Sequence, residues 1–272
     1  MCDNDGPKKI GVRTLRRMGE AGEKIVAITA YDTLMARMAD ESGAHLLLVG
    51  DSLGMTMLGY KTTIPVTLDD SLSHTAAVAR GVKTAMVVGD MPFLTYQINA
   101  EEALRNAGRF LQEAGADAVK LEGGVSVAPT IKRMVQAGIP VLGHVGILPQ
   151  SVLAEGGYRV HGRTPEEAAA MEADALAVQE AGAFAIVLEG LPASLGERIT
   201  QTLDIPTIGI GAGPACSGQI QVIHDILGLF EDFVPRHTKQ YVNLAKAARQ
   251  ALCDYRQDVI SGTFPGKEQS FK

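Results

Sequence analysis

The sequence predicts a TIM (β/α)8 barrel, and three observations support this fold class. One sequence pattern occurs three times: a predicted helix ends at Gly, an apolar run follows, and an acidic residue ends the run. Eight short apolar runs are present, as is typical of strands buried on both faces of a parallel sheet. Helical sequence separates most of these runs, which is the alternation of an α/β barrel. A doubly wound open sheet is the main alternative.

The predicted strands come from these apolar runs. In each occurrence of the repeated pattern the Gly is a helix C-cap signal, because Gly adopts the left-handed conformation at little cost. Each copy therefore predicts the end of a helix followed by a buried strand. The last connection is short, unlike the others. In chain order, the predicted strands are 25–30, 46–50, 84–89, 118–121, 140–143, 185–188, 206–210 and 220–223.

Capping signals place the helices between the strands. Asn99 stands before a run with two acidic residues, and Thr164 stands before a Pro and two acidic residues, which are typical helix starts. No linker composition interrupts the pattern, so we expect one catalytic domain over residues 1–272. Further helices are predicted at 33–42, 69–80, 125–137, 193–203 and 240–257.

Composition and charge exclude several functional classes. With 25 Lys and Arg against 31 Asp and Glu, the net charge of −6 argues against a nucleic-acid-binding surface. No apolar run approaches the roughly 18 residues of a membrane span. The N-terminal residues show no targeting signal, so a cytoplasmic protein is expected. Three cysteines, Cys2, Cys216 and Cys253, lie far apart and are expected to be reduced and structural.

Polar residues follow the predicted strands, where a TIM barrel carries its chemistry. Asp51, Asp90 and Glu122 follow the second, third and fourth strands and should lie close together. Such hard oxygen ligands suit Mg²⁺, and a divalent cation would keep neighbouring carboxylates ionised. The alternative is that each acid caps the following helix. The polar residues at the strand ends are Tyr31, Asp32, Asp51, Ser52, Asp90, Lys120, Glu122, His144, Glu189, His224 and Asp225, with Gly211 after the seventh strand.

Lys120 lies two residues before Glu122, so both side chains should point to the same face. A Lys beside carboxylates stays charged and could hold a substrate carboxylate or stabilise an enolate. The competing role is a Schiff-base lysine, but nearby acids should hold the pKa of this amine high. Electrostatic stabilisation is therefore favoured.

Glu189 is separated from the three acids and ends an apolar run. An apolar setting would raise the pKa of this carboxyl toward neutrality, which suits a general base that removes a proton beside a carbonyl. A helix N-cap is the alternative role. His144 ends the fifth strand, where it could reach a substrate or reagent, or could be a structural hydrogen-bonding group.

Nine short stretches carry a more specific signal when they are taken together. They are ITAYD at 28–32, VGDSLGM at 49–55, GDMPF at 89–93, VKLEGG at 119–124, GHVG at 143–146, PQS at 149–151, LE at 188–189, IGIGAG at 208–213 and FPG at 264–266. With these stretches the chain resembles the ketopantoate hydroxymethyltransferase family over nearly its whole length.

The resemblance implies a reaction and a fold. The fold would be a TIM barrel of the phosphoenolpyruvate/pyruvate superfamily. The reaction would transfer a hydroxymethyl group from 5,10-methylenetetrahydrofolate to 3-methyl-2-oxobutanoate and form 2-dehydropantoate, in pantothenate biosynthesis. The expected partners are therefore a small oxo acid and a folate. A cytoplasmic homo-oligomer, often a decamer, is also implied.

The resemblance also implies roles for the residues at the strand ends. By this resemblance, Asp51, Asp90 and Glu122 would bind the metal, and these are the acids already proposed as a Mg²⁺ site. Glu189 would be the proton acceptor that generates an enolate. Contacts with the oxo acid fall to Asp51, Ser52, Asp90 and Lys120.

Some roles remain open on the sequence alone. Pterin recognition leaves no short motif, and His144 is a candidate auxiliary residue on the folate side. A Mg²⁺-dependent aldolase or lyase of the same superfamily is the second enzyme hypothesis. Lyases of this kind carry a nucleophilic Cys in a loop, and neither Cys216 nor Cys253 has such a setting. The third hypothesis is a catalytically silent barrel that binds an oxo acid as a regulator.

Overall fold

The computed structural model describes residues 8–231 and 233–271. The chain clusters into two compact units, one ending at Val222 and the other beginning at Ile223. Cys2 lies outside the described residues, whereas Cys216 and Cys253 are free thiols. The expectation of a single domain over the whole chain stays a prediction.

The first unit is a closed barrel of eight parallel strands, in which each strand pairs with the next and β8 pairs with β1. The TIM-barrel prediction is therefore confirmed. The strands are β1 (Ile25–Thr29), β2 (Leu46–Val49), β3 (Met86–Asp90), β4 (Ala118–Lys120), β5 (Val141–Gly146), β6 (Ala185–Glu189), β7 (Thr207–Ile210) and β8 (Gly218–Gln221).

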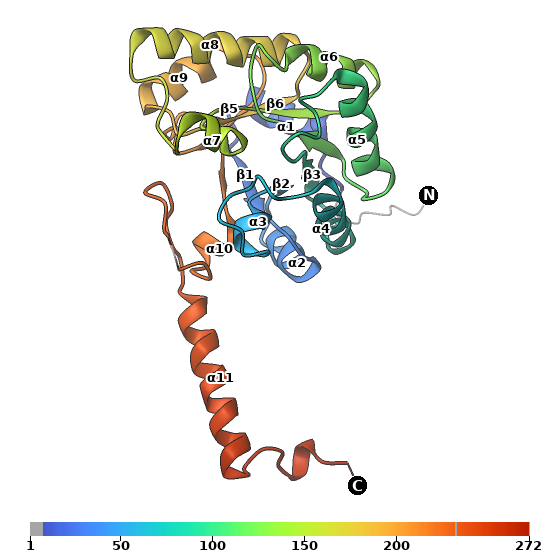
Figure 1. Cartoon of the computed structure of the whole chain (residues 1–272), viewed down its shortest axis with the longest axis vertical. Coiled ribbons are helices and arrows are strands. Elements are labelled where there is room, and N and C mark those ends of the chain that lie inside the picture. The colour runs from blue at the N-terminus through green and yellow to red at the C-terminus, as the bar shows by residue number, and fades with distance from the viewer. Residues whose placement is uncertain (1–7, 232, 272) are drawn as a thin grey trace. The chain divides into compact units, whose positions relative to one another are not determined.

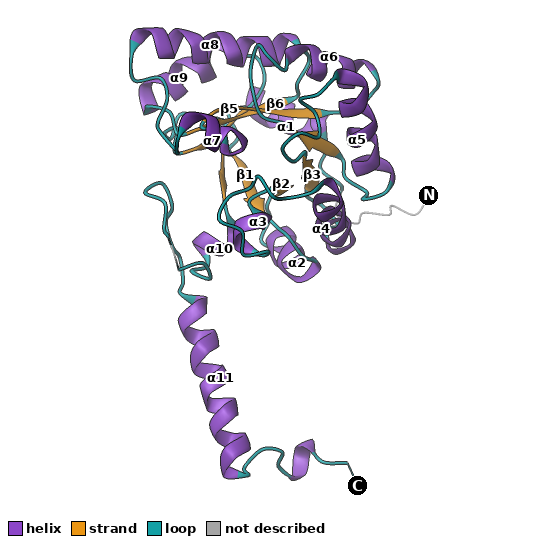
Figure 2. Cartoon of the chain, viewed as in Figure 1, coloured by secondary structure: helices purple, strands orange, loops and turns teal. Residues whose placement is uncertain are grey.

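Helices of the first unit surround these strands, as Figures 1 and 2 show. Both predicted capping residues are confirmed, because Asn99 accepts a hydrogen bond from Glu102 N and Thr164 accepts one from Glu167 N. The helices are α1 (Val12–Glu20), α2 (Thr33–Glu41), α3 (Leu53–Thr56), α4 (Leu68–Gly81), α5 (Ala100–Gln112), α6 (Ala128–Gln136), α7 (Val152–Glu155), α8 (Pro165–Glu180) and α9 (Ala193–Thr202), with a 3-10 turn η1 (Pro149–Ser151).

The second unit contains α10 (Ile223–Ile226), α11 (Leu244–Ser261) and the 3-10 turn η2 (Lys267–Gln269). Main-chain hydrogen bonds from Tyr241 N to Ile226 O and from Leu244 N to Leu227 O join the chain at and just before the start of α11 to the C-terminal end of α10. Taken together, the helices that the structure describes include none with the length and apolar character of a membrane span.

Two predicted elements are displaced along the chain. The eighth strand was expected at 220–223 but occupies Gly218–Gln221, because Gly218 pairs with both β1 and β7 although it has no apolar side chain. The apolar residue Ile223, on which the predicted end of the eighth strand depended, is instead the first residue of α10. The last long helix was expected at 240–257 and is found at Leu244–Ser261, where the Asn243 side chain caps it.

The barrel interior is filled by alternate residues of all eight strands. These inward side chains form one apolar cluster, which Leu15 and Met18 of α1 join. Helix α1 was not predicted from the sequence, although it contributes these two buried residues. The cluster has the continuous apolar character expected of strands in a parallel barrel. Its strand members are Ile25, Ala27, Leu46, Leu48, Met86, Val88, Ala118, Leu142, Ala185, Val187, Ile208 and Ile220.

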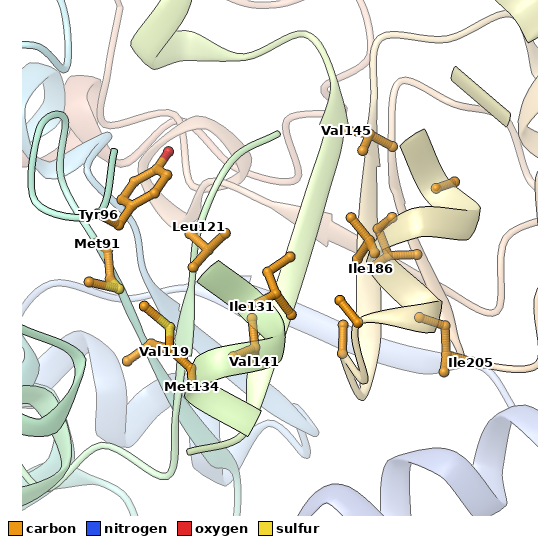
Figure 3. Packing of buried hydrophobic residues seen from close by; sticks show 14 of the residues in the cluster. Met91, Tyr96, Val119, Leu121, Ile131, Met134, Val141, Val145, Ile186 and Ile205 are labelled. Atoms are coloured by element: carbon orange, nitrogen blue, oxygen red, sulfur yellow. The ribbon is translucent and has the colours of Figure 1, made fainter. Parts of the chain in front are cut away.

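A second cluster packs the outer face of the strands against the helices. Val119, Ile186 and Leu188 contribute from the strands, while Phe110 and Ile131 contribute from α5 and α6. Figure 3 shows the part of this cluster around Met134 and Val141. The strands are therefore buried on both faces, and only their ends can carry polar groups facing a ligand.

A buried carboxylate fixes the start of β3. Asp40 of α2 accepts main-chain hydrogen bonds from Lys83, Thr84 and Ala85. Burial acts to raise the pKa of Asp40, but the hydrogen bonds from Thr84, Ala85 and Lys83 lower it below its ordinary value. The ionised form is therefore the one that the fold stabilises.

We expect Asp40→Asn to lower the free energy of unfolding by roughly 2–3 kcal/mol, since it weakens several hydrogen bonds to a charged acceptor. Because the pKa of Asp40 is lower when folded, its contribution should be full above the unfolded pKa and lost as the pH falls through the folded one. Chemical denaturation at several pH values measures both effects. The exposed neighbour Glu41, changed to Gln, is the control, and equal loss in the two variants would contradict the prediction.

Candidate active site

The polar site continues the inward-facing positions of the barrel strands. Side chains alternate between the two faces of a strand, so a residue two positions beyond an inward residue also points inward. Asp90 follows Val88, Lys120 follows Ala118, His144 follows Leu142 and Glu189 follows Val187, and all four of these apolar residues belong to the interior cluster. The sequence therefore changes from apolar to polar at the C-terminal end of the barrel, where these four side chains come together.

Lys120 lies within a group of acids at the ends of β3 and β4. Its Nζ is 2.7 Å from Asp90 Oδ1 and 2.8 Å from Asp90 Oδ2, and 3.6 Å from Glu122 Oε1. Asp90 and Lys120 are register partners on adjacent strands, which explains the short contact. Asp51 N donates a hydrogen bond of 3.1 Å to Asp90 Oδ2. The structure therefore brings these four predicted site residues together.

The electrostatics of this cluster follow from burial. Asp51, Asp90, Lys120 and Glu122 are each at most 4% exposed. Burial raises the pKa of Asp90 to about 7 and raises that of Glu122 well above its ordinary value, although the charge of Lys120 opposes both shifts. Burial alone would lower the pKa of Lys120, but the charges of Asp90, Glu122 and Asp51 raise it. This direction agrees with the high pKa expected for Lys120 and disfavours a Schiff-base role.

The chemistry of the three acids fits a divalent cation. With all groups ionised, three carboxylates and one ammonium carry two net negative charges, which a divalent cation would neutralise. Glu122 Oε1 is buried and has no hydrogen-bond partner among the described residues. In the described part of the chain, no three Asp, Glu, His or Cys side chains are arranged so that they could hold a metal ion by themselves. Mg²⁺ commonly keeps water or substrate oxygens in its shell, so it does not need a closed set of protein ligands.

Glu189 and His144 form a second polar pair across β5 and β6. His144 Nε2 lies 3.3 Å from Glu189 Oε2, and His144 Nδ1 lies 3.7 Å from Glu122 Oε1. Neither ring nitrogen has an aligned hydrogen-bond partner in the described residues. The Glu189 side chain is 21% exposed, whereas that of His144 is 2% exposed. The apolar setting expected for Glu189 is thus incomplete, because an imidazole lies beside it.

The close approach of these two strands depends on Gly146. Gly146 is the register partner of Glu189 and has a φ of +104°, a conformation that favours glycine. A Cβ atom at position 146 would lie 2.0 Å from the main-chain oxygen of Glu189. Because Ile147 N donates to the same oxygen at 2.9 Å, the backbone of Glu189 is held directly against the end of β5.

The remaining predicted residues have other settings. Ser52 Oγ lies 2.8 Å from Tyr31 OH, next to Asp51 in the chain. Asp32 caps α2, since its side chain accepts from Leu34 N and Met35 N. The strand-end assignment of His224 and Asp225 was wrong, because both lie in α10 of the second unit.

The helix-capping alternative is wrong for the acids of the site. Asp51 accepts from Gln150, Asp90 from Lys120 and Asp51 N, and Glu122 from Gln150 N. The helix after Glu189 has Pro192 as its N-cap residue, with no side-chain capping bond. Sequence reasoning missed Gln150, whose only signal was its place in the PQS stretch at 149–151.

The barrel fold of this chain is that of a known structural class. Solved structures with the same fold include 2,3-dimethylmalate lyase, a PEP mutase/isocitrate lyase superfamily member, with a TM-score of 0.63, 20% identity and coverage of 96% of this chain and 92% of that chain. Phosphonopyruvate hydrolase in complex with oxalate and Mg²⁺ gives a TM-score of 0.62 at 15% identity, covering 96% and 93%. The predicted fold class is therefore confirmed.

Sequence similarity identifies the family within this class. The sequence model described as ketopantoate hydroxymethyltransferase matches residues 9–267. A 3-methyl-2-oxobutanoate hydroxymethyltransferase of Chloroflexus aurantiacus is 60% identical over 96% of this chain and 92% of its own length. The protein of that name in Syntrophus aciditrophicus is 54% identical over 97% of each chain. The chain belongs to the ketopantoate hydroxymethyltransferase family.

Proposed function

We propose that this chain transfers a hydroxymethyl group from 5,10-methylenetetrahydrofolate to 3-methyl-2-oxobutanoate, forming 2-dehydropantoate for pantothenate biosynthesis. Family membership supports the substrates. The observation that carries the chemistry is the position of Glu189, a partly exposed carboxylate beside a buried cluster that contains Lys120. This arrangement supports a role for Glu189 as a base next to groups that can stabilise negative charge on an oxo acid.

We propose that Asp51, Asp90 and Glu122 hold Mg²⁺. When bound, the cation would supply Lewis-acid stabilisation of negative charge on the substrate oxygen. The burial of these carboxylates and their excess negative charge support this assignment. Asp51, Ser52, Asp90 and Lys120 are the proposed contacts of the oxo acid.

The residues of the chain would act in a defined order. The ammonium of Lys120 would pair with the substrate carboxylate, and the surrounding acids keep that ammonium charged. Glu189 would take the proton from C3 of the oxo acid, which leaves an enolate. The enolate carbon would then attack the one-carbon unit of the folate, so that a carbon–carbon bond replaces the broken C–H bond and water supplies the hydroxyl group. Both C–N bonds of the methylene bridge break, and tetrahydrofolate leaves with the C3 proton and one proton of the water on its nitrogens. Fixed orientation of both substrates supplies much of the rate.

His144 is a proposed auxiliary residue that contacts the base or the folate. Burial lowers the pKa of His144 below its ordinary value, while Glu189 acts in the opposite direction. We therefore expect the imidazole to remain mainly neutral at pH 6.5, where an unperturbed His is half protonated. A ¹⁵N NMR titration checks this, with His144→Gln to assign the signal. A midpoint at or above the ordinary value would contradict the prediction.

A lyase remains the alternative that shares the fold. Cys216 is buried, and burial raises the pKa of its thiol, which makes it a poor nucleophile. Cys253 lies on α11 of the second unit. Cys216 therefore lacks the setting of a nucleophile and Cys253 lies in a helix rather than a loop, so the transferase is the better supported function.

The test is a turnover assay with purified protein. We expect 2-dehydropantoate to form only when both 3-methyl-2-oxobutanoate and the folate are supplied, and to stop when a chelator removes divalent cations. Cleavage of an oxo acid without folate would favour the lyase instead, and binding of the oxo acid without any proton exchange would favour the silent barrel. A cytoplasmic homo-oligomer, a decamer, is proposed from the family resemblance, and sedimentation analysis would check its size.

A further inference from the structure

Gln150 connects two of the candidate metal ligands. It lies in η1 and is only 4% exposed. Its side-chain Nε2 donates to Asp51 Oδ2 at 3.0 Å and to the main-chain oxygen of Met91 at 2.9 Å. Its main-chain N donates to Glu122 Oε2 at 3.1 Å. One residue therefore contacts both Asp51 and Glu122, which follow different strands of the barrel.

The side-chain amide of Gln150 has a single satisfactory orientation. Its Oε1 accepts hydrogen bonds from Tyr96 OH at 2.8 Å and from Gln97 Nε2 at 3.1 Å. A Gln side chain offers two donor hydrogens and two acceptor lone pairs, so all four are used. Turning the amide by half a rotation would place its oxygen against the oxygens of Asp51 and Met91. The network therefore fixes which end of the amide faces Asp51.

Tyr96 supports this arrangement from the core. Its hydroxyl accepts a hydrogen bond from Glu122 N at 3.1 Å and donates to Gln150 Oε1. Figure 3 shows the ring of Tyr96 within the apolar cluster, with the hydroxyl oxygen turned away from the side chain of Met91. The packed ring thus anchors both the Gln150 amide and the backbone of Glu122.

We propose that Gln150 is a positioning residue that holds the carboxylates of Asp51 and Glu122 in the orientation that receives the divalent cation. This inference rests on the metal site of the proposed function. Gln150 N binds Glu122 Oε2, and Glu122 Oε1 has no hydrogen-bond partner among the described residues, so it is available to a cation. Because the amide is neutral, it orients the acids without changing the charge that attracts the cation.

The test compares Gln150→Met with Gln97→Met by calorimetric titration of Mg²⁺ into the full-length protein, in saturating 3-methyl-2-oxobutanoate. Met fills a similar volume and keeps the main-chain N–H that binds Glu122, but it removes the side-chain hydrogen bonds to Asp51 and Met91, so the variant tests the side-chain amide. Groups that orient metal ligands typically contribute a factor of 10–100 in affinity, so we expect the Kd for Mg²⁺ to rise by roughly that factor in Gln150→Met. Gln97→Met removes a hydrogen bond to the same amide from an exposed residue, so it should stay close to wild type.

The outcomes separate the inference from the function on which it rests. Unchanged Mg²⁺ affinity in Gln150→Met would overturn the positioning role, even if the metal-free melting temperature falls. A wild type that binds no Mg²⁺ with the oxo acid present would overturn the metal site itself, and this inference with it. If Gln150→Met does not fold, Tyr96→Phe takes its place, because it keeps the ring and loses the hydroxyl. A raised Kd in that variant supports the role, and an unchanged Kd overturns it.

Discussion

Glu189→Gln is expected to abolish proton exchange at C3 of 3-methyl-2-oxobutanoate and to lower turnover by roughly 10²- to 10⁴-fold, the range that a general base contributes. Gln has nearly the same shape as Glu but cannot accept the proton at neutral pH. The side chain is 21% exposed and 3.3 Å from His144, so the substitution should leave the fold intact.

Proton NMR in D₂O, with and without Mg²⁺, measures this exchange directly and does not require the folate step. The control is Glu197→Gln, the same chemical change at an exposed position of α9. We expect metal-dependent exchange in the wild type and in Glu197→Gln. Exchange at the wild-type rate in Glu189→Gln would show that another group is the base. If the wild type exchanges only after tetrahydrofolate is added, deprotonation waits for the folate.

Lys120→Met is expected to be the most destabilising change in the site. Removing one partner of a buried ion pair leaves uncompensated charge and costs roughly 3–5 kcal/mol of unfolding free energy. Here the loss would leave the carboxylates of Asp90, Glu122 and Asp51 with no ammonium nearby. Turnover should fall as well, by roughly 10²-fold or more, because a preorganised charge beside the substrate is lost.

The direction in which the stability of Lys120→Met changes with pH follows from the pKa of Asp90. The pKa of Asp90 is already raised by burial, and loss of the Lys120 charge should raise it further. The folded variant would then bind more protons than the unfolded chain, so its stability should decrease as the pH rises. Denaturation of metal-free protein between pH 6 and 8 measures this, and Mg²⁺ should stabilise the variant at least as strongly as the wild type.

Lys9→Met is the matched control for this experiment. Lys9 also pairs with a carboxylate, Asp117, at 3.0 Å, but the two side chains are 42% and 34% exposed. Such a solvated pair contributes at most about 1 kcal/mol. If Lys120→Met lost no more stability than Lys9→Met at pH 8, the buried acids would have to be neutral, and the ionised cluster proposed here would be wrong.

Most of the barrel could be predicted because its signals are local. A Gly that ends a helix and a run of apolar residues are read within one stretch of chain, and all eight strands lie within three residues of their predicted bounds. β8 is shifted by two residues at both ends because Gly218 is held by pairing with Ile25 and Ile208, which are distant in sequence. Long-range pairing of a residue without a side chain leaves no local pattern.

The site shows the same distinction. Asp90, Lys120 and Glu189 could be found from their place at the ends of apolar runs, since strand periodicity fixes the face on which they lie. The role of Gln150 depends on a contact with Asp51, which is 99 residues away in the sequence. It also depends on Tyr96, and no spacing in the sequence connects these three positions. Contacts of this kind become visible only in the folded chain.

Gly146 has a consequence for anyone who would widen the substrate range of this enzyme by directed evolution. Every residue with a Cβ atom would collide with the main chain of Glu189, so position 146 offers a library no usable diversity. Gly143 on the same strand differs, because a Cβ atom there would meet the side chain of Val178 and not a main-chain atom. A library that randomises the half-buried residues Ile147 and Leu148, and leaves β5 unchanged, would keep a far larger share of its members folded, with the carboxylate and the imidazole still in place.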